Sequence, residues 1–353
     1  MDTGAGHGGA FARAAAVAVF ALACLPGIAT ADPGRTKSGT VTSNGNEFEY
    51  ILYTPASYRP RRPAPLMVMV HGCGTTAEQQ MKVSLYNRLA ERKRFIVLYP
   101  DVDAISRSLP GPLHQCWKFF DPLSYSRDSG DAAAIADMTR FAMDRRSVNP
   151  QRVYLAGISA GGLMASVEAA AYSDIYAAVG IMSSAGYLDG PCFTTGLGIP
   201  VELSAQLAFA AMGSRARIVP RFVLGGDADL AFPWSCTQKA LEQGLRTNNL
   251  VLSGRQTGPI SLAPAAVRRR QKPGGRAYTV SRYRDPAGCL IGESWRIHGM
   301  GHVWSGGTDD PALAGYTDVQ GPSAARAAWS FLSRYRKSRT AMPCAETRSG
   351  GRR

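Results

Sequence analysis

A serine flanked by glycines is the residue of this chain best suited to nucleophilic chemistry. It stands at the centre of Gly157-Ile158-Ser159-Ala160-Gly161, which has the pattern G-x-S-x-G. An apolar stretch precedes the pattern and an alanine-rich stretch follows it, which predicts a strand, a sharp turn and a helix. Such a turn pushes the hydroxyl out of the backbone, and glycines are needed where strand and helix pass closely. We expect Ser159 to be a nucleophile; an inert serine in a glycine-rich turn is the alternative.

A serine hydroxyl is a poor nucleophile at neutral pH and needs a general base. From residue 32 onward the chain holds four histidines, His71, His114, His298 and His302. If the chain follows the order serine, acid, histidine, only the last two come late enough. His302 lies in a glycine-rich loop just after a predicted strand, where such sites collect their residues, and is the expected base. His298 is the weaker candidate, and its other interpretation is a histidine that braces the site.

The acid that orients the base is less clearly marked. The predicted strand 221–224 runs into Gly-Gly-Asp-Ala-Asp, so Asp227 and Asp229 both lie at a strand end between the serine and the histidines. Asp227 could instead be a turn-forming residue, and Glu293 is a remote third choice. The residues alone leave open which of these carboxylates orients the base, although Asp229 is favoured.

An oxyanion hole needs two backbone N–H donors, each worth about 10²–10³ in rate. One is expected from Ala160, directly after the nucleophile. The other is expected from the turn that follows the predicted strand 66–70, where the sequence reads His71-Gly72-Cys73-Gly74. The N–H of Cys73 is the candidate donor there. His71 is then expected to be structural rather than a second base.

Strand and helix patterns alternate along the chain. Repeated strand–helix units predict an α/β fold, in which helices cover both faces of a mainly parallel sheet. Apolar or alternating runs predict strands at 48–53, 66–70, 95–99, 176–182, 221–224, 278–283 and 294–297, and helical patterns cover 77–92, 129–144, 236–246 and 324–335. Two segments stand apart: 103–126 is expected to be a surface loop near the site, and 252–275, which is rich in proline, glycine and arginine, an insertion or a flexible excursion.

The first 31 residues have the features of a secretory signal peptide. Arg13 precedes an apolar run over 14–25, and Ala29-Thr30-Ala31 forms a cleavage site, so cleavage is expected after Ala31. A lipoprotein signal through Cys24 is the weaker interpretation. The apolar run is too short for a stable membrane span, and no other segment is long and apolar enough. We therefore expect a secreted protein with one catalytic domain over 32–340 and a basic tail over 341–353.

Charge and cysteine usage narrow the function further. The 353 residues carry a formal charge of +14, concentrated in part near 268–276. No nucleic-acid motif accompanies this charge, so solvated surface charge is preferred over contact with anionic envelope or polymer surfaces. Six cysteines follow residue 31, which allows up to three disulfides in an oxidising compartment and 15 complete pairings. No Cys-x-x-Cys pair or histidine–cysteine cluster indicates a metal site.

With these residues in place, the chain resembles the polyhydroxybutyrate (PHB) depolymerase family of esterases, which includes feruloyl and acetylxylan esterase-like members. The resemblance implies an α/β-hydrolase fold, a secreted serine esterase and the triad Ser159–Asp229–His302. It also places Cys73 in the oxyanion loop and implies a disulfide between Cys73 and Cys116. The shared pieces are VHGCG at 70–74, CW at 116–117, RDSGD at 127–131, GISAGG at 157–162, Asp229 and GHVWSGG at 301–307.

The expected chemistry is ester hydrolysis through an acyl-enzyme, with no cofactor and no metal. The expected substrates are poly- or oligo-3-hydroxyalkanoates or related esters; no separate adsorption domain is evident, which favours amorphous polymer, oligomers or small esters. A feruloyl or acetylxylan esterase acting on plant polysaccharide is the alternative. A non-catalytic envelope-binding protein is less consistent with the intact site. Trp117 and Trp304 are candidates for the pocket wall, with packing roles equally open, and the oligomeric state is not indicated.

Overall fold

The computed structural model describes Gly6 and residues 33–337. Contacts within the chain separate residues 1–31 from residues 32–353. Apart from Gly6, the predicted signal peptide lies outside the described residues, as does the predicted tail over 341–353. Every described helix and strand belongs to the second unit.

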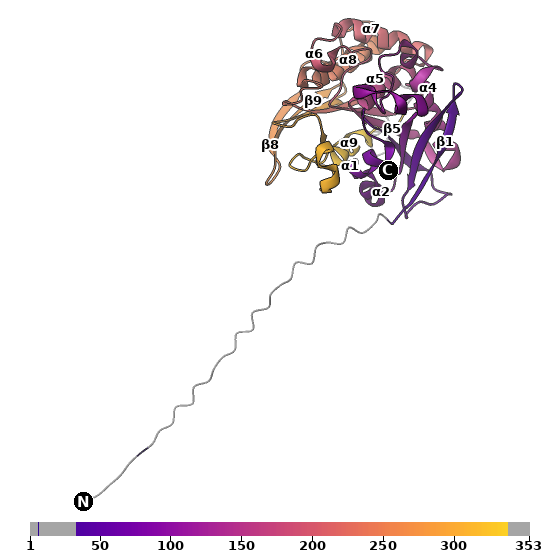
Figure 1. Ribbon diagram of the computed structural model, residues 1–353. Helices are drawn as coiled ribbons and strands as arrows, with labels where there is room; N and C mark the ends of the chain where they lie inside the picture. The colour runs from indigo at the N-terminus through magenta and orange to yellow at the C-terminus, as the bar shows by residue number, and fades with distance from the viewer. Residues whose placement is uncertain (1–5, 7–32, 338–353) are drawn as a thin grey trace, which may run out of the picture. The chain divides into compact units, whose positions relative to one another are not determined.

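Within residues 33–337, ten strands form a single sheet that is parallel in its middle and antiparallel at both ends. The chain therefore has the α/β fold that the sequence predicts. In spatial order the strands are β1 (Arg35–Ser43), β2 (Asn46–Thr54), β4 (Ile96–Asp103), β3 (Ala64–Val70), β5 (Val148–Ile158), β6 (Ala178–Met182), β7 (Arg221–Gly226), β10 (Leu290–Ile297), β9 (Ala277–Arg284) and β8 (Ala266–Gln271). The two ends of this sheet, β1 and β8, lie on opposite sides of the domain (Figure 1).

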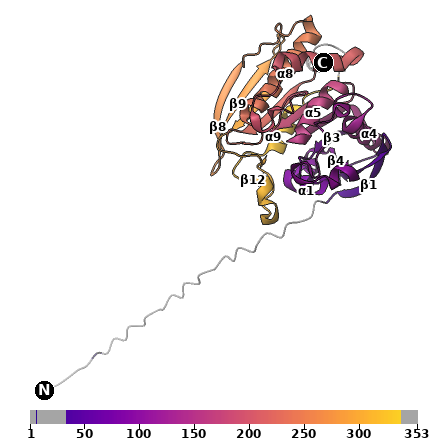
Figure 2. The same cartoon turned by 45° about the horizontal axis from the view of Figure 1, so that its top comes forward.

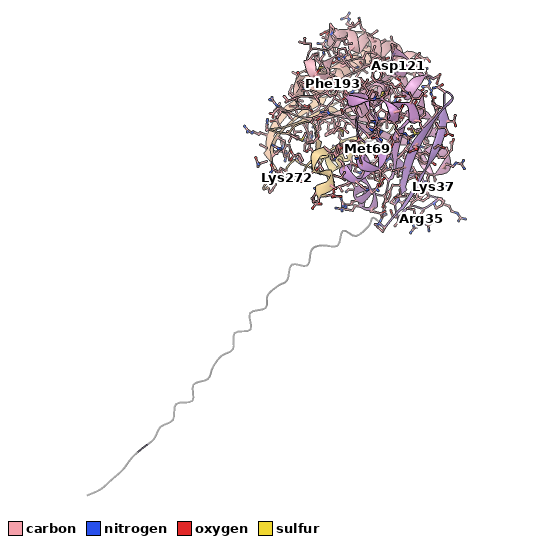
Figure 3. All side chains as sticks on the ribbon, viewed as in Figure 1. Arg35, Lys37, Met69, Asp121, Phe193 and Lys272 are labelled. Carbon is pink, nitrogen blue, oxygen red and sulfur yellow. A yellow bond between two sulfur atoms is a disulfide. The ribbon has the colours of Figure 1, made fainter. Side chains whose placement is uncertain are left out.

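Helices bury both faces of the sheet, because successive side chains of a strand point to opposite faces. Leu66, Val68 and Val70 of β3 pack into one core with α4 (Gly130–Arg145), α5 (Ala160–Ala171), α7 (Val201–Met212) and α8 (Trp234–Ser253). Met67 and Met69 pack into the other core, with α1 (Ala77–Ser84), α2 (Tyr86–Lys93) and α9 (Ala324–Leu332). Figure 2 shows β3 and β4 between α4 and α5 on one side and α1 on the other, and Figure 3 labels Met69 in the interior.

The helix predicted over 77–92 is in fact two helices. Leu85 separates α1 from α2 with a left-handed backbone, φ 58°. The carbonyl of Val83 accepts a hydrogen bond from the N–H of Thr308 (3.1 Å), a residue more than 200 positions away. A distant loop therefore forms a hydrogen bond with a carbonyl near the end of α1. The local sequence pattern does not reveal this contact, so it does not predict the break between the two helices.

The two segments that stand apart in the sequence are more ordered than expected. Segment 103–126 contains α3 (Ala104–Ser108) and two short 3₁₀ turns, η1 (Gly111–Leu113) and η2 (Pro122–Tyr125). Segment 252–275 contains the edge strand β8, which pairs with β9 and carries three exposed arginines, Arg268, Arg269 and Arg270. Charged side chains on an edge strand discourage pairing with other chains.

The remaining elements are short. They are α6 (Cys192–Thr195), η3 (Gly213–Arg215), β11 (Trp304–Ser305), η4 (Pro311–Tyr316) and β12 (Thr317–Asp318). Strand β1 and helix α7 were not predicted from the sequence. Across the part of the chain that the structure describes, no helix has both the length and the apolar character that crossing a bilayer requires.

Candidate active site

Ser159 occupies a sharp turn between β5 and α5. Its backbone has φ 57° and ψ −126°, a conformation that a non-glycine residue rarely adopts and that is typical of functional turns. A Cβ atom on Gly157 would lie 2.1 Å from the carbonyl oxygen of Gly161, and one on Gly161 would lie 2.4 Å from that of His71. Both glycines are therefore required by close backbone contact, as the sequence predicts.

The side chains of Ser159, His302 and Asp229 form a continuous hydrogen-bonded chain. Nε2 of His302 lies 2.9 Å from Oγ of Ser159, and Nδ1 of His302 lies 2.9 Å from Oδ2 of Asp229. The Asp229 carboxylate is buried, and its Oδ1 accepts the N–H groups of Ala231 and Phe232 at 2.9 Å. With its Nδ1–H directed at this carboxylate, neutral His302 presents the lone pair of Nε2 to the serine hydroxyl.

Asp227, the alternative acid, contacts a different histidine, His298. Its Oδ2 lies 2.8 Å from Nδ1 of His298, and its Oδ1 accepts the N–H of Gly299 at 2.7 Å. Burial raises the pKa of Asp227, but these hydrogen bonds outweigh it and leave that pKa below its ordinary value. Nε2 of His298 lies 3.0 Å from Oγ1 of Thr279. Asp227 and His298 therefore hold the loop that leads to His302 and do not face Ser159.

The third acid candidate, Glu293, is also engaged elsewhere. Its carboxylate accepts hydrogen bonds from Nε of Arg282 at 2.8 Å and from Nε1 of Trp295 at 2.7 Å. Of the three acids considered from the sequence, only Asp229 contacts His302.

The turn over 71–74 lies directly against Ser159. A Cβ atom on Gly72 would be 3.0 Å from Cβ of Ser159. The carbonyl of Gly72 accepts hydrogen bonds from Oγ1 of Thr75 at 2.8 Å and from Nδ1 of His71 at 2.7 Å. The N–H of Cys73 belongs to the same trans peptide and points the opposite way. Within residues 33–337 this N–H donates to no other group, so it is available to an oxyanion.

A disulfide joins Cys73 to Cys116, the pairing that the resemblance implies. It ties the turn over 71–74 to segment 103–126. A second disulfide joins Cys192 to Cys236. Two disulfides within the described residues are compatible with an oxidising compartment.

The two tryptophans proposed for the pocket wall have different surroundings. Trp117 is fully buried behind the turn, where its Nε1 donates to the carbonyl of His71 at 3.1 Å and the two ring centroids are 5.3 Å apart. These contacts favour the packing interpretation for Trp117. Trp304 is almost fully buried against Tyr86, but one part of it lines the small cavity beside Ser159.

That cavity has a volume of about 70 Å³ and contains Ser159 and His302 in its wall. Its other lining residues include Gly72, Gln79, Val83 and Tyr316. A larger hollow of about 540 Å³ on β1 and β2 includes none of the predicted site residues. Of these two hollows, only the small cavity is lined by Ser159 and His302.

Sequence reasoning missed Asp101, whose Oδ1 lies 3.2 Å from Nε2 of His71. A signal for it was present, because Asp101 follows the predicted strand 95–99 and polar residues at the carboxyl ends of parallel strands gather at functional sites. Phe232 was also missed; its ring centroid is 5.9 Å from that of His302. Its position depends on a loop whose course is not locally encoded.

The parallel central sheet and the strand–serine–helix turn define the class of an α/β-hydrolase. The fold is shared with an acetyl xylan esterase from Aspergillus awamori, with a TM-score of 0.58 at 19% identity, covering 75% of this chain and 94% of that one. Residues 48–195 match the family described as Esterase PHB depolymerase. The matched part includes Ser159 and the turn over 71–74.

Two curated relatives share part of the chain. The poly(3-hydroxyalkanoate) depolymerase C of Paucimonas lemoignei is 33% identical over 152 residues, 43% of this chain and 35% of the relative. The acetylxylan esterase of Coprinopsis cinerea is 31% identical over 138 residues, 38% of this chain and 34% of the relative. The chain therefore spans about a third of the length of these relatives.

Proposed function

We propose that this protein is a serine esterase that hydrolyses carboxylic esters through an acyl-enzyme on Ser159. One observation carries the proposal: His302 bridges Ser159 and the buried carboxylate of Asp229 at 2.9 Å on each side. This arrangement supplies a nucleophile, a base in the correct tautomer and a counter-charge for the imidazolium that forms.

In the proposed reaction, Oγ of Ser159 attacks the ester carbonyl while Nε2 of His302 takes the hydroxyl proton. The tetrahedral oxyanion accepts hydrogen bonds from the N–H groups of Cys73 and Ala160. His302 then returns the proton to the alcohol as the C–O bond breaks, which leaves the acyl group on Ser159. Water, deprotonated by His302, attacks that ester, and His302 then returns the proton to Oγ of Ser159 as the second tetrahedral intermediate collapses and releases the acid. Asp229 stays ionised throughout and orients His302.

The substrates we propose are poly- or oligo-3-hydroxyalkanoates or related esters. The family description and the similarity to a poly(3-hydroxyalkanoate) depolymerase support this choice. The second candidate is a polysaccharide ester of the acetylxylan or feruloyl type, supported by a nearly equal identity to an acetylxylan esterase. Both use the same catalytic groups. Rates on hydroxybutyrate oligomers, acetylated xylo-oligosaccharides and methyl ferulate, compared on one preparation, decide between them.

We also propose that the protein is exported, with cleavage after Ala31 and a catalytic domain over 32–340. The two disulfides support export, because such bonds persist in oxidising compartments. The N-terminal sequence of the protein recovered outside the cytoplasm tests the cleavage position, and a mature protein that retains residues 1–31 would contradict it.

The central test replaces the nucleophile. Ser159→Ala is expected to abolish turnover of p-nitrophenyl butyrate and covalent labelling by a fluorophosphonate, with the thermal unfolding midpoint nearly unchanged. Ser126→Ala, a change at an exposed serine, is the matched control and should keep wild-type activity and labelling. Equal activity in Ser159→Ala and the wild type would contradict the esterase proposal and would favour the alternative of a non-catalytic envelope-binding protein.

A further inference from the structure

An apolar surface lies beside His302, on the side of its partner Asp229. The ring centroid of Phe232 is 5.9 Å from that of His302, and the ring centroid of Phe193 is 5.3 Å from that of Phe232. Leu230 follows Asp229 directly in the chain. Phe232 is buried, whereas Phe193 is 37% exposed (Figure 3) and Leu230 is 86% exposed. We call Phe193, Leu230 and Phe232 the apolar shelf.

Two bonds hold together the segments that form the apolar shelf. The disulfide Cys192–Cys236 joins α6 to α8, and the N–H of Thr194 donates to the carbonyl of Ala231 at 2.7 Å. Phe232 packs with both cysteines in one buried cluster. Single exposed apolar residues are common on protein surfaces, but apolar residues that are grouped and held in place beside a reactive side chain are typical of a binding surface.

The cavity beside Ser159 is formed by a different part of the chain. Its wall contains Gly72 and Cys73 of the turn over 71–74, together with Gln79 and Val83 of α1. An apolar cavity of about 150 Å³ can hold benzene, so the volume of about 70 Å³ here admits a group of about three or four non-hydrogen atoms. This cavity therefore fits only a short side of an ester.

The proposed reaction fixes which side of the ester meets which surface. The carbonyl oxygen faces the N–H groups of Cys73 and Ala160. The alkoxy oxygen must lie within hydrogen-bonding reach of Nε2 of His302, which returns the proton to it. The alcohol part therefore extends from His302, whose ring adjoins Phe232. The acyl part is left on the side of the turn over 71–74, where the small cavity lies.

We propose that the apolar shelf binds the alkyl chain of the alcohol part of the ester, while the cavity beside Ser159 limits the acyl part to a short group. This inference rests on the proposed esterase function and names its substrate class, esters of short acids with longer, apolar alcohols. In an oligo-3-hydroxyalkanoate the alcohol part is the remainder of the chain, and its aliphatic units lie along the shelf. The shelf residues determine specificity and take no part in proton transfer.

Two isomeric esters test this orientation. Hexyl acetate and ethyl hexanoate contain the same atoms, but the six-carbon chain is on the alcohol side in the first and on the acyl side in the second. We expect kcat/KM for hexyl acetate to exceed the values for ethyl hexanoate and ethyl acetate by about tenfold, because burial of two methylene groups accounts for this factor. The difference from ethyl acetate should arise mainly in KM. Equal or faster hydrolysis of ethyl hexanoate would overturn the proposal.

Variants of the two exposed shelf residues test the surface itself. Leu230→Asn and Phe193→Asn should each lower the ratio of kcat/KM for hexyl acetate to kcat/KM for ethyl acetate by about threefold or more, because a polar side chain no longer holds the alkyl chain. Leu230→Met keeps an apolar side chain and should retain the wild-type ratio. Val267→Asn, a change at an exposed apolar residue of β8, is the matched control and should also retain it.

Each ratio compares two substrates on one preparation, so a partial loss of folded protein does not alter it. A fall of the same size in Val267→Asn, or an unchanged ratio in both Leu230→Asn and Phe193→Asn, would overturn the proposal.

Binding without turnover separates this inference from the proposed function. In Ser159→Ala, saturation-transfer NMR should detect the alkyl protons of 1-hexanol, the product alcohol, and adding Leu230→Asn should weaken this signal about threefold or more. If the wild type hydrolyses ethyl acetate and none of these effects depends on Leu230, the shelf assignment fails and the esterase stands. If the wild type hydrolyses no ester while binding of 1-hexanol depends on Leu230, the esterase proposal fails and the binding surface stands.

Discussion

The carboxylate of Asp229 lies 2.9 Å from Nδ1 of His302, and two backbone N–H groups hold it there. Asp227 stands only two residues earlier, yet it faces His298. Both aspartates follow strand β7 and only Ala228 separates them, yet their carboxylates contact different histidines. This divergence supports Asp229 as the proposed acid and gives Asp227 contacts to the segment before His302.

Asp229→Asn is expected to lower kcat by about 10⁴, because an amide in place of the carboxylate no longer favours the required tautomer of His302 or stabilises its charged form. Asp227→Asn should lower kcat far less and reduce the free energy of unfolding by about 1–3 kcal/mol, since it weakens charge-assisted bonds to Gly299 and His298. Steady-state kinetics and denaturant unfolding on both variants check this. A larger kcat loss for Asp227→Asn would reverse the assignment.

The two disulfides should contribute nearly equally to the free energy of unfolding but unequally to kcat. They close loops of 43 and 44 residues in sequence separation, and chain entropy predicts about 4 kcal/mol for each. Removing Cys73–Cys116 with paired alanines should also lower kcat about tenfold or more, because the bond anchors the turn that carries the proposed oxyanion donor. Removing Cys192–Cys236 should cost stability with a smaller effect on kcat. Equal kcat losses in the two double variants would contradict this division.

The glycines around Ser159 should tolerate no side chain. Gly157→Ala places a Cβ 2.1 Å from the carbonyl oxygen of Gly161, and Gly161→Ala places one 2.4 Å from two carbonyl oxygens. Because backbone must move in both cases, each variant should lose about 3 kcal/mol or more of unfolding free energy. Gly315→Ala is the control, since a Cβ there meets no atom within 4 Å. Denaturant unfolding gives the comparison, and a loss at Gly315 as large as at Gly157 would refute it.

The contribution of Glu168 to the free energy of unfolding should fall as the pH rises. It is fully buried in α5, and burial raises its pKa well above 4.5, with hydrogen bonding to Tyr176 opposing the shift only in part. The folded protein therefore keeps a proton that the unfolded chain releases above about pH 4.3, so the contribution of Glu168 to stability is fully present below that pH and is lost as the pH rises. Glu168→Gln removes this dependence and should raise the unfolding midpoint at pH 8 by about 2–4 °C.

The control for this effect is Glu47→Gln, a change at an exposed position. Its midpoint should follow the wild type at every pH. The difference between Glu168→Gln and the wild type should grow from pH 5 to pH 8 in differential scanning calorimetry. A constant difference would show that Glu168 does not hold its proton in the folded state.

Local patterns in the sequence were sufficient to propose Ser159 as the nucleophile and to predict close backbone contact at the glycines beside it. The strand, turn and helix around Ser159 are contiguous, and the requirement for glycine at position 157 arises from Gly161, four residues away. At position 161 it arises from the carbonyl oxygens of Val70 and His71 at the end of β3, a contact that only the folded chain makes. The alternation of buried strands and helices likewise follows from side-chain periodicity, which is a local property. The family resemblance added the pairing of Cys73 with Cys116, because that pairing joins residues 43 positions apart.

The tertiary structure alone determined which side chains from distant loops contact one another. The choice between Asp229 and Asp227 depends on the path of the loop after β7 relative to the loop after β10, and both aspartates are equally well placed in the sequence. Asp101 became recognisable as the partner of His71 only when β3 and β4 were paired. Hydrogen bonds between segments far apart in the chain fix these side chains. The sequence by itself therefore determined the candidate groups. The packing of β3, β4, β7 and β10 determined which of these groups face one another.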